Sequence, residues 1–124
     1  MSKDSYYFQH DSHARHDPKI IALINKYGLE GYGRFWVVIE MLRESSFYRL
    51  EDKEYMWYAL AEQMHISEEE THKFIKDCIE KFELLQLNDG LIYSNALLLR
   101  MNKLDDIRAK RKRSAEIRWE ITNA

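Results

Sequence analysis

The clearest structural signal in the chain lies in residues 57–82, which read WYALAEQMHISEEETHKFIKDCIEKF. Ser67 is followed three residues later by Glu70, the arrangement of a helix capping box, and apolar residues then recur at helical spacing. Apolar residues before Ser67 form a second helical stripe, so only a short turn separates two helices. We therefore predict helices at 53–64 and 68–82, arranged as a helix-turn-helix.

Downstream of this helix pair, two short apolar segments flank the turn sequence Asn88-Asp89-Gly90. Glycine adopts the left-handed backbone conformation that such a turn requires, so residues 84–93 are predicted to form a β-hairpin. A hairpin that directly follows a helix-turn-helix is a wing. The expected fold class is therefore mainly α, a winged helix-turn-helix with a small β-hairpin wing. Residues 46–50 are predicted to add a short strand.

The N-terminal half is expected to supply two further helices. Asp17 and Pro18 are a strong helix start, since aspartate caps the helix and proline at its first position loses no needed donor. Apolar spacing predicts helices at 18–27 and 32–45, and the glycine-rich residues 28–33 between them are predicted to form a tight connection. The second of these helices is apolar over most of its circumference, which is typical of a central helix.

At the C-terminal end, Ser94 is expected to cap a last helix at 95–110. The apolar stripe of this helix fades after Ile107, and a run of Arg and Lys follows that cannot enter a core. This run is expected to be either a projecting solvated helix or a disordered tail. The chain is accordingly divided into an N-terminal arm, a winged-helix domain, and a basic C-terminal tail or linker to a further region, at residues 1–17, 18–107 and 108–124.

Length, charge and cysteine usage bound the kind of protein. The chain has 124 residues, enough for one compact domain but not for two cores. Residues 1–99 carry 11 Lys and Arg against 17 Asp and Glu, while residues 100–124 carry 8 against 4. The basic charge is concentrated at one end, as in many proteins that bind polyanions. A single cysteine, an N-terminus without a signal-peptide pattern and the lack of a long apolar run favour a cytoplasmic protein with no membrane contact.

No arrangement of catalytic residues stands out, so we expect neither an enzyme nor a cofactor. Histidines and aspartates near the N-terminus have a metal-like composition, at His10, Asp11, His13, His16 and Asp17. Their spacing does not match that of structural zinc ligands, and helix capping explains the last of them more simply. Cys78 lies on the apolar stripe of its helix and is expected to be an inert core residue. The glycine-rich connection follows a helix and lacks the Gly-Lys-Ser/Thr ending of a phosphate-binding loop.

Several stretches of the chain resemble a known family. They lie mainly in the N-terminal half, as Tyr7-Phe8-Gln9-His10-Asp11, Ala14-Arg15-His16-Asp17-Pro18-Lys19-Ile20, Tyr27-Gly28-Leu29-Glu30-Gly31-Tyr32-Gly33, Trp36 and Glu40. With them, residues 6–100 resemble the N-terminal domain of phage and prophage replication proteins related to the DnaD-type replisome organisers. The resemblance implies a winged-helix module at the front of a longer protein that assists replication initiation, by binding DNA or by self-association. It also implies other replication proteins as partners, and a C-terminal region that would follow Ala124.

The expected nucleic-acid contacts are divided between the second helix of the pair and the basic C-terminal run. The first turn of that helix carries Glu68, Glu69 and Glu70, which repel a duplex but suit the positive end of the helix dipole. The C-terminal run is therefore the stronger candidate for phosphate contact, with the helix-turn-helix as its scaffold. The candidate nucleic-acid-binding residues are Lys73, Lys76, Arg100, Lys103, Arg108, Lys110, Arg111, Lys112, Arg113 and Arg118.

Two functions remain open from the sequence. The first is binding of duplex DNA with little sequence specificity, and the alternative is association of the domain with itself, as a homodimer, or with other proteins. Lys and Arg gathered on one face would favour DNA, whereas a patch of exposed aromatic residues would favour association. The candidate aromatic residues are Tyr6, Tyr7, Phe8, Tyr48, Tyr55 and Tyr58.

Overall fold

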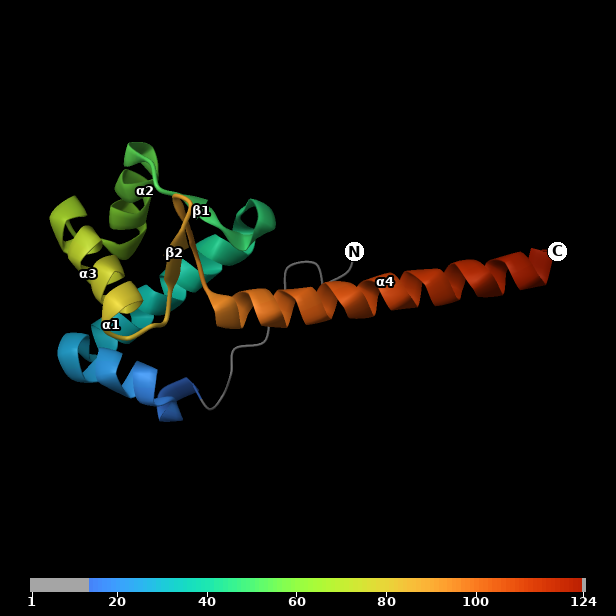
Figure 1. Ribbon diagram of the computed structural model, residues 1–124, viewed down its shortest axis with the longest axis horizontal. Helices are drawn as coiled ribbons and strands as arrows, with labels where there is room; N and C mark the ends of the chain where they lie inside the picture. Colours follow the sequence, from blue (N-terminus) through green and yellow to red (C-terminus); the bar gives the residue numbers. More distant parts are fainter. Residues whose placement is uncertain (1–13, 124) are drawn as a thin grey trace.

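The computed structural model describes residues 14–123, which form a mainly helical body and one helix that projects from it (Figure 1). The elements follow in the order η2 (Ala14–His16), α1 (Pro18–Glu44), η3 (Ser46–Tyr48), β1 (Leu50–Glu51), α2 (Glu54–Met64), α3 (Glu68–Glu80), β2 (Gln86–Asn88), β3 (Leu91–Tyr93) and α4 (Asn95–Asn123). The described strands form one small antiparallel sheet. The predicted mainly helical class is confirmed for these residues.

The helix pair predicted from the capping pattern is present as α2 and α3, which pack against each other. Ser67 caps α3 as expected, because its Oγ accepts a hydrogen bond from Glu70 N at 3.1 Å. His65 ends α2 in the left-handed conformation, with a φ of 58°. This residue and the cap that follows it reverse the chain within a short turn.

The predicted hairpin is also present, as β2 and β3. Asp89 and Gly90 have φ values of 53° and 71°, the positive values that a tight hairpin turn requires. β1 pairs with the other edge of β3, where Leu50 lies opposite Ile92, so the sheet order is β1-β3-β2. The sheet therefore joins the end of α1 to the start of α4.

The strand predicted at 46–50 is wrong in its first part. Residues Ser46–Tyr48 form the 3-10 turn η3, and strand pairing begins only at Leu50. Phe47 and Tyr48 have φ values of 56° and 60°, which no β-strand contains. The strand in this part of the chain is therefore limited to Leu50 and Glu51.

The glycine-rich connection predicted at 28–33 is shorter than expected: Gly28 interrupts the helix directly after residue 27, as predicted, but residues 29–33 are helical. Gly28 has a φ of 72° and a ψ of −170°, and this single residue kinks α1 (Figure 1). Gly31 serves a different purpose, since a Cβ built on it would lie 2.3 Å from the Cβ of Tyr27. The two helices predicted here are thus segments of one kinked helix that packs closely on itself at the bend.

A buried carboxylate holds the first segment of α1 against α3. Asp77 is 6% exposed and accepts hydrogen bonds from Lys26 Nζ at 2.7 Å and from the Tyr27 hydroxyl. Burial raises the pKa of the Asp77 carboxyl, but the hydrogen bonds from Lys26 and Tyr27 outweigh it, so the pKa lies below its ordinary value. The hydrogen bond to Asp77 raises the pKa of Lys26, and burial together with the same carboxylate raises the pKa of Tyr27 to about 12.

Replacing Asp77 by Asn should lower the free energy of unfolding at neutral pH by about 1–3 kcal/mol, because the amide loses the ion pair with Lys26. The pKa of Asp77 is depressed in the folded state, so its stabilisation is present above the ordinary carboxyl pKa of 3.8 and is lost as pH falls through the folded pKa. Urea unfolding at about pH 7 and about pH 2.5 tests this. The difference between parent and variant should shrink at the lower pH, and an equal difference at both would contradict the ion pair's role.

The core includes the beginning of α4, which fixes the direction of the whole helix. Leu97 and Met101 are 4% and 0% exposed, and Ser94 Oγ caps the helix by accepting a hydrogen bond from Leu97 N at 3.2 Å. α4 then continues to Asn123, so its predicted end at residue 110 is wrong. Most residues after that point are Ala, Arg, Lys or Glu, which favour helix even without a core to pack on.

Candidate nucleic-acid interface

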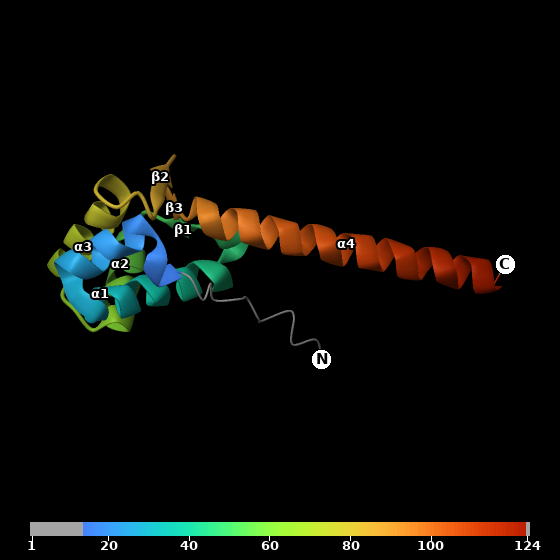
Figure 2. The same cartoon turned by 90° about the horizontal axis from the view of Figure 1, so that it is seen from below.

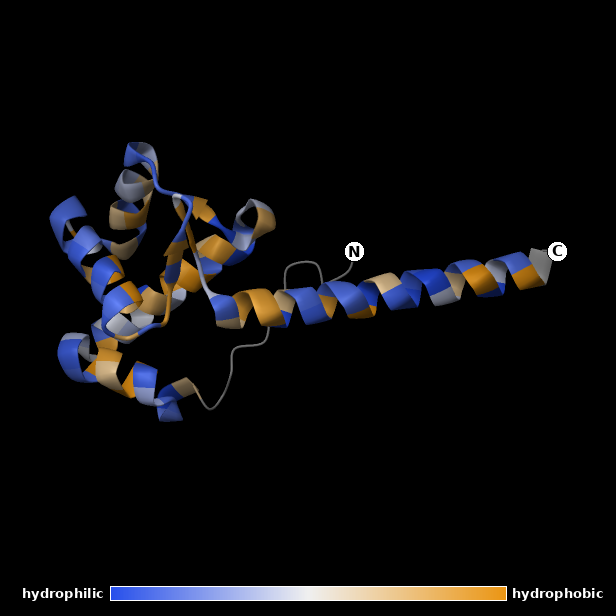
Figure 3. Cartoon of the chain, viewed as in Figure 1, coloured by the Kyte–Doolittle hydropathy of each residue, from blue (hydrophilic) through white to orange (hydrophobic). Residues whose placement is uncertain are grey.

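α4 leaves the body after its first few turns and continues as a straight rod (Figures 1 and 2). Its body-facing residues Leu97, Met101, Leu104 and Arg108 are buried or half-buried, whereas every residue from 109 to 121 is exposed. Most of this projecting part is hydrophilic (Figure 3). The basic C-terminal run predicted as either a helix or a disordered tail is therefore a projecting helix.

Basic and acidic residues lie on different sides of α4, as follows from the rotation of about 100° around the helix axis between successive residues. Five cations share an arc of about 100° that contains no carboxylate, and we call them the basic stripe: Arg100, Lys103, Lys110, Arg111 and Arg118. Another arc of about 100° holds the carboxylates Asp105, Asp106, Glu116 and Glu120. Arg100, the first residue of the stripe, is half-buried, and the other four side chains are exposed.

The remaining basic candidates on α4 lie outside this stripe. Arg108 and Lys112 follow the body-facing side, and Arg113 falls among the carboxylates. A guanidinium nitrogen of Arg108 lies 3.7 Å from Asp105 Oδ1, and the Tyr48 hydroxyl lies 3.4 Å from Asp105 Oδ2. Arg108 is thus anchored where the helix leaves the body, and Lys112 stands one turn beyond it.

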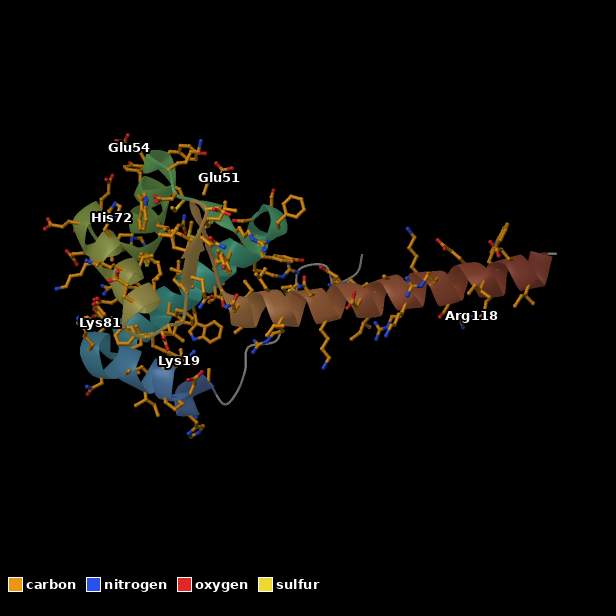
Figure 4. All side chains as sticks on the ribbon, viewed as in Figure 1. Lys19, Glu51, Glu54, His72, Lys81 and Arg118 are labelled. Carbon is orange, nitrogen blue, oxygen red and sulfur yellow. The ribbon has the colours of Figure 1, made fainter. Side chains whose placement is uncertain are left out.

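The two candidates on α3 do not join this surface. Lys73 and Lys76 are exposed, but Glu69 precedes the first by four residues and Glu80 follows the second by four. Residues four apart are neighbours on a helix, so each lysine has a carboxylate beside it. In the basic stripe the same holds for Lys110, which follows Asp106 by four residues, but Arg100, Arg111 and Arg118 have no carboxylate three or four residues away. Figure 4 shows His72 and Lys81 on α3 at the opposite end of the molecule from Arg118. The exposed face of α3 is therefore close to electrically neutral and separate from the basic stripe.

Two exposed aromatic residues of the described part were missed by the sequence reasoning, Phe47 and Trp119, and Trp119 near the end of α4 is 67% exposed. Phe47 in η3 is 81% exposed, and no periodicity distinguishes it from a core residue. Of the aromatic residues considered for association, Tyr55 and Tyr58 on α2 are exposed and Tyr48 is half-buried. Those outside the described residues are Tyr6, Tyr7 and Phe8.

The residues considered for metal binding or covalent chemistry have structural roles where they are described. Asp17 caps α1 as predicted, since its Oδ1 accepts a hydrogen bond from Lys19 N at 2.9 Å. Cys78 is fully buried as predicted, and burial raises the pKa of its thiol to about 12, which makes it unreactive. Within residues 14–123, no three His, Cys, Asp or Glu side chains gather to hold a metal ion. Outside the described residues are His10, Asp11 and His13.

The described residues define a mainly helical domain with a small antiparallel sheet and a projecting helix that carries a basic stripe. The family model described as Lin1244/Lin1753-like, N-terminal, matches residues 7–97, and the chain belongs to this family. The match covers the body and ends in the first turn of α4, before the basic stripe begins. No curated protein and no solved structure matches the chain. None of the helices in the described part combines the length and apolar character needed to cross a membrane.

Proposed function

We propose that this domain is a DNA-binding module of a phage-type replication initiation protein, acting in the cytoplasm, and that the basic stripe supplies its phosphate contacts. The observation that carries the proposal is the gathering of five Lys and Arg residues on one face of α4 without a carboxylate among them. Duplex DNA carries one negative charge per ~1.7 Å of its axis. Such a face is attracted to any duplex, whatever its sequence.

The dimensions of the stripe suit contact with several phosphates. Arg100 and Arg118 are separated by about 27 Å along the helix axis, at ~1.5 Å per residue, which equals the length of about eight base pairs. A straight helix presents these side chains in a fixed order, so one segment of duplex can meet them together. Binding through phosphates positions a protein on DNA without reading the bases.

In this proposal the body is a winged helix that orients α4. Support comes from the order of elements, since the α2–α3 pair is followed directly by the β2–β3 hairpin and β1 pairs with that hairpin. The resemblance to DnaD-type replisome organisers supports the same assignment. Glutamates in the first turn of α3 argue against entry of this helix into the major groove, which leaves phosphate contact to α4.

Self-association is the second candidate, and exposed apolar side chains favour it. Ile117, Trp119 and Ile121 near the end of α4 are 55%, 67% and 72% exposed, and Tyr55 and Tyr58 on α2 are also exposed. Large exposed apolar groups of this kind commonly mark protein contacts. Ile117 and Ile121 lie on the side of α4 that carries the basic stripe, so a homodimer formed through them would compete with DNA, whereas one formed through Trp119, Tyr55 and Tyr58 would leave the stripe open.

Fluorescence anisotropy with labelled duplexes tests the proposed function. Two duplexes of unrelated sequence should bind with a Kd of about 10⁻⁴ to 10⁻⁶ M at physiological salt, and the two values should agree within about twofold, because phosphate contacts do not depend on sequence. Absence of binding to either duplex at millimolar protein would refute the proposal. Strong preference for one sequence would show that base contacts, which the stripe does not provide, dominate.

A further inference from the structure

The body-facing side of α4 continues past the body as an exposed surface with its own composition. Leu97, Met101 and Leu104 pack into the core, and the same arc of about 80° then carries Arg108, Lys112, Ala115 and Trp119. Lys112 and Trp119 lie roughly 6 and 16 Å beyond Arg108 along the helix axis. This side differs from the basic stripe, and it is the side through which the start of α4 packs against the body.

The turn η3 lies next to α4, because the Tyr48 hydroxyl is 3.4 Å from Asp105 Oδ2, and it carries an exposed aromatic residue. Phe47 is 81% exposed and has a φ of 56°, a conformation that bulky residues rarely adopt. The backbone is held there because Arg49 donates a hydrogen bond to the Phe47 carbonyl at 2.7 Å and Tyr48 N donates one to Ser45 O at 3.1 Å. Strained residues that the surrounding structure enforces are often functional.

Direct contacts tie this turn to α4 at the point where the helix leaves the body. The Tyr48 hydroxyl lies 3.4 Å from one oxygen of Asp105, and Arg108 lies 3.7 Å from the other. Phe47 is next to Tyr48 in the chain, so this exposed residue lies close to the same junction. Asp105 is thus engaged by both neighbours, Tyr48 through one carboxylate oxygen and Arg108 through the other.

We propose that this inner corner, made of Phe47, Arg108, Lys112 and Trp119, binds single-stranded DNA. Unpaired bases stack on the two aromatic rings, and the phosphates between them contact the two cations. Cations interleaved with exposed aromatic rings are the combination that binds single strands with little regard to sequence, because every base has a face that can stack. The inference rests on the proposed function and adds to it a second substrate form, held on a different side of the same helix.

Charge and openness favour a nucleic acid strand over a protein partner. An apolar partner segment would have to remove Arg108 and Lys112 from water, which is unfavourable because their nearest carboxylates, Asp105 and Glu116, belong to α4 itself and the partner would add no anion. A DNA strand supplies an anion for each of them. The corner is also open along α4, as a chain of repeating phosphates and bases requires.

The test compares an unstructured oligonucleotide of twenty thymidines with a 20-base-pair duplex, using the full chain. The corner variant combines Phe47→Gly and Trp119→Ala, and the control replaces Leu29 on α1, an exposed apolar residue outside both proposed surfaces, by Ala. We expect the corner variant to lose at least about tenfold in affinity for the single strand and less than about twofold for the duplex. The control should bind both as the parent does. Glycine adopts a positive φ without strain, so the thermal unfolding midpoint should not fall.

The outcomes separate this inference from the proposed function. An unchanged single-strand affinity in the corner variant overturns the inference, as does an equal loss for single strand and duplex. If the parent binds the single strand through the corner but no duplex, the proposed duplex function fails while the inference stands. If sedimentation finds a parent dimer that the corner variant converts to a monomer, with no change in single-strand binding, the corner is a self-association surface and the inference is wrong.

Discussion

Reversing three charges of the basic stripe should weaken duplex binding by roughly a hundredfold or more. The variant replaces Lys103, Lys110 and Arg111 by Glu, which removes three phosphate contacts and adds three repulsions. An exposed ion pair contributes about 2.5-fold to affinity, so three losses and three repulsions of that size multiply to a few hundredfold. Glutamate is a good helix former, so α4 should persist in circular dichroism spectra.

A charge-matched control shows whether position or net charge is responsible. Replacing Lys53, Lys73 and Lys76 by Glu changes the net charge by the same amount but leaves the basic stripe intact. These side chains are exposed on or beside α2 and α3, away from α4. Anisotropy at a single low salt concentration should show a much smaller loss for this control. Equal losses in the two variants would mean that binding follows the overall charge of the protein.

The largest effect on folding is expected from adding one methyl group at Gly31. The Cβ of Gly31→Ala would lie 2.3 Å from the Cβ of Tyr27 and 3.7 Å from a ring carbon of Phe74. The first distance is shorter than any that two non-bonded carbon atoms adopt, so Tyr27 or the helix would have to shift. Tyr27 cannot move freely, because its hydroxyl donates to Asp77 and its ring packs edge-on against Phe74 at 5.1 Å. The substitution should therefore lower the free energy of unfolding by about 1–3 kcal/mol.

Gly33 is the matched control for this substitution. It lies in the same helix, and a Cβ built on it meets nothing within 4 Å. Gly33→Ala should raise the free energy of unfolding by about 0.5–1 kcal/mol, because alanine loses less backbone entropy in a helix. Urea unfolding of the two variants measures the opposite signs directly. A destabilised Gly33→Ala, or a neutral Gly31→Ala, would contradict the close packing at the bend.

Local chemistry accounts for the parts of the fold that the sequence predicted well. Ser67 and the turn residues Asp89 and Gly90 act through their own backbone neighbours, so their roles can be recognised without tertiary contacts. The same holds for Asp17 as the cap of α1. The hairpin and the helix pair follow from these signals.

Predictions failed where tertiary contacts decide the backbone. Three glycines in residues 28–33 look like a loop, but only Gly28 leaves the helical conformation. Residue 31 has to be glycine because Tyr27 occupies the space that a Cβ would need, and Tyr27 is held in place by Asp77, which is distant in the sequence. The end of α4 was placed too early because the apolar stripe stops there, although helix-forming residues continue. The exposure of Phe47 depends on a strained turn that no pattern of residue types reveals.

The candidate interface was predicted in part. All five residues of the basic stripe were among the sequence candidates, because the charge imbalance at the C-terminus is visible without a structure. Their separation from Arg108, Lys112 and Arg113 required knowing that one helix continues through the whole run. Once that is known, a rotation of about 100° per residue assigns each cation to its side.

The salt dependence of duplex binding tests the central claim most directly, because it counts the phosphates that the protein neutralises. Anisotropy titrations between about 50 and 200 mM salt should give a plot of log K against log salt with a slope near −4.5, at about −0.9 for each of five phosphates. The variant with Lys103, Lys110 and Arg111 replaced by Glu should show a much shallower slope. A slope near zero for the parent, or a steep slope that charge reversal leaves unchanged, would contradict DNA binding through the basic stripe of α4.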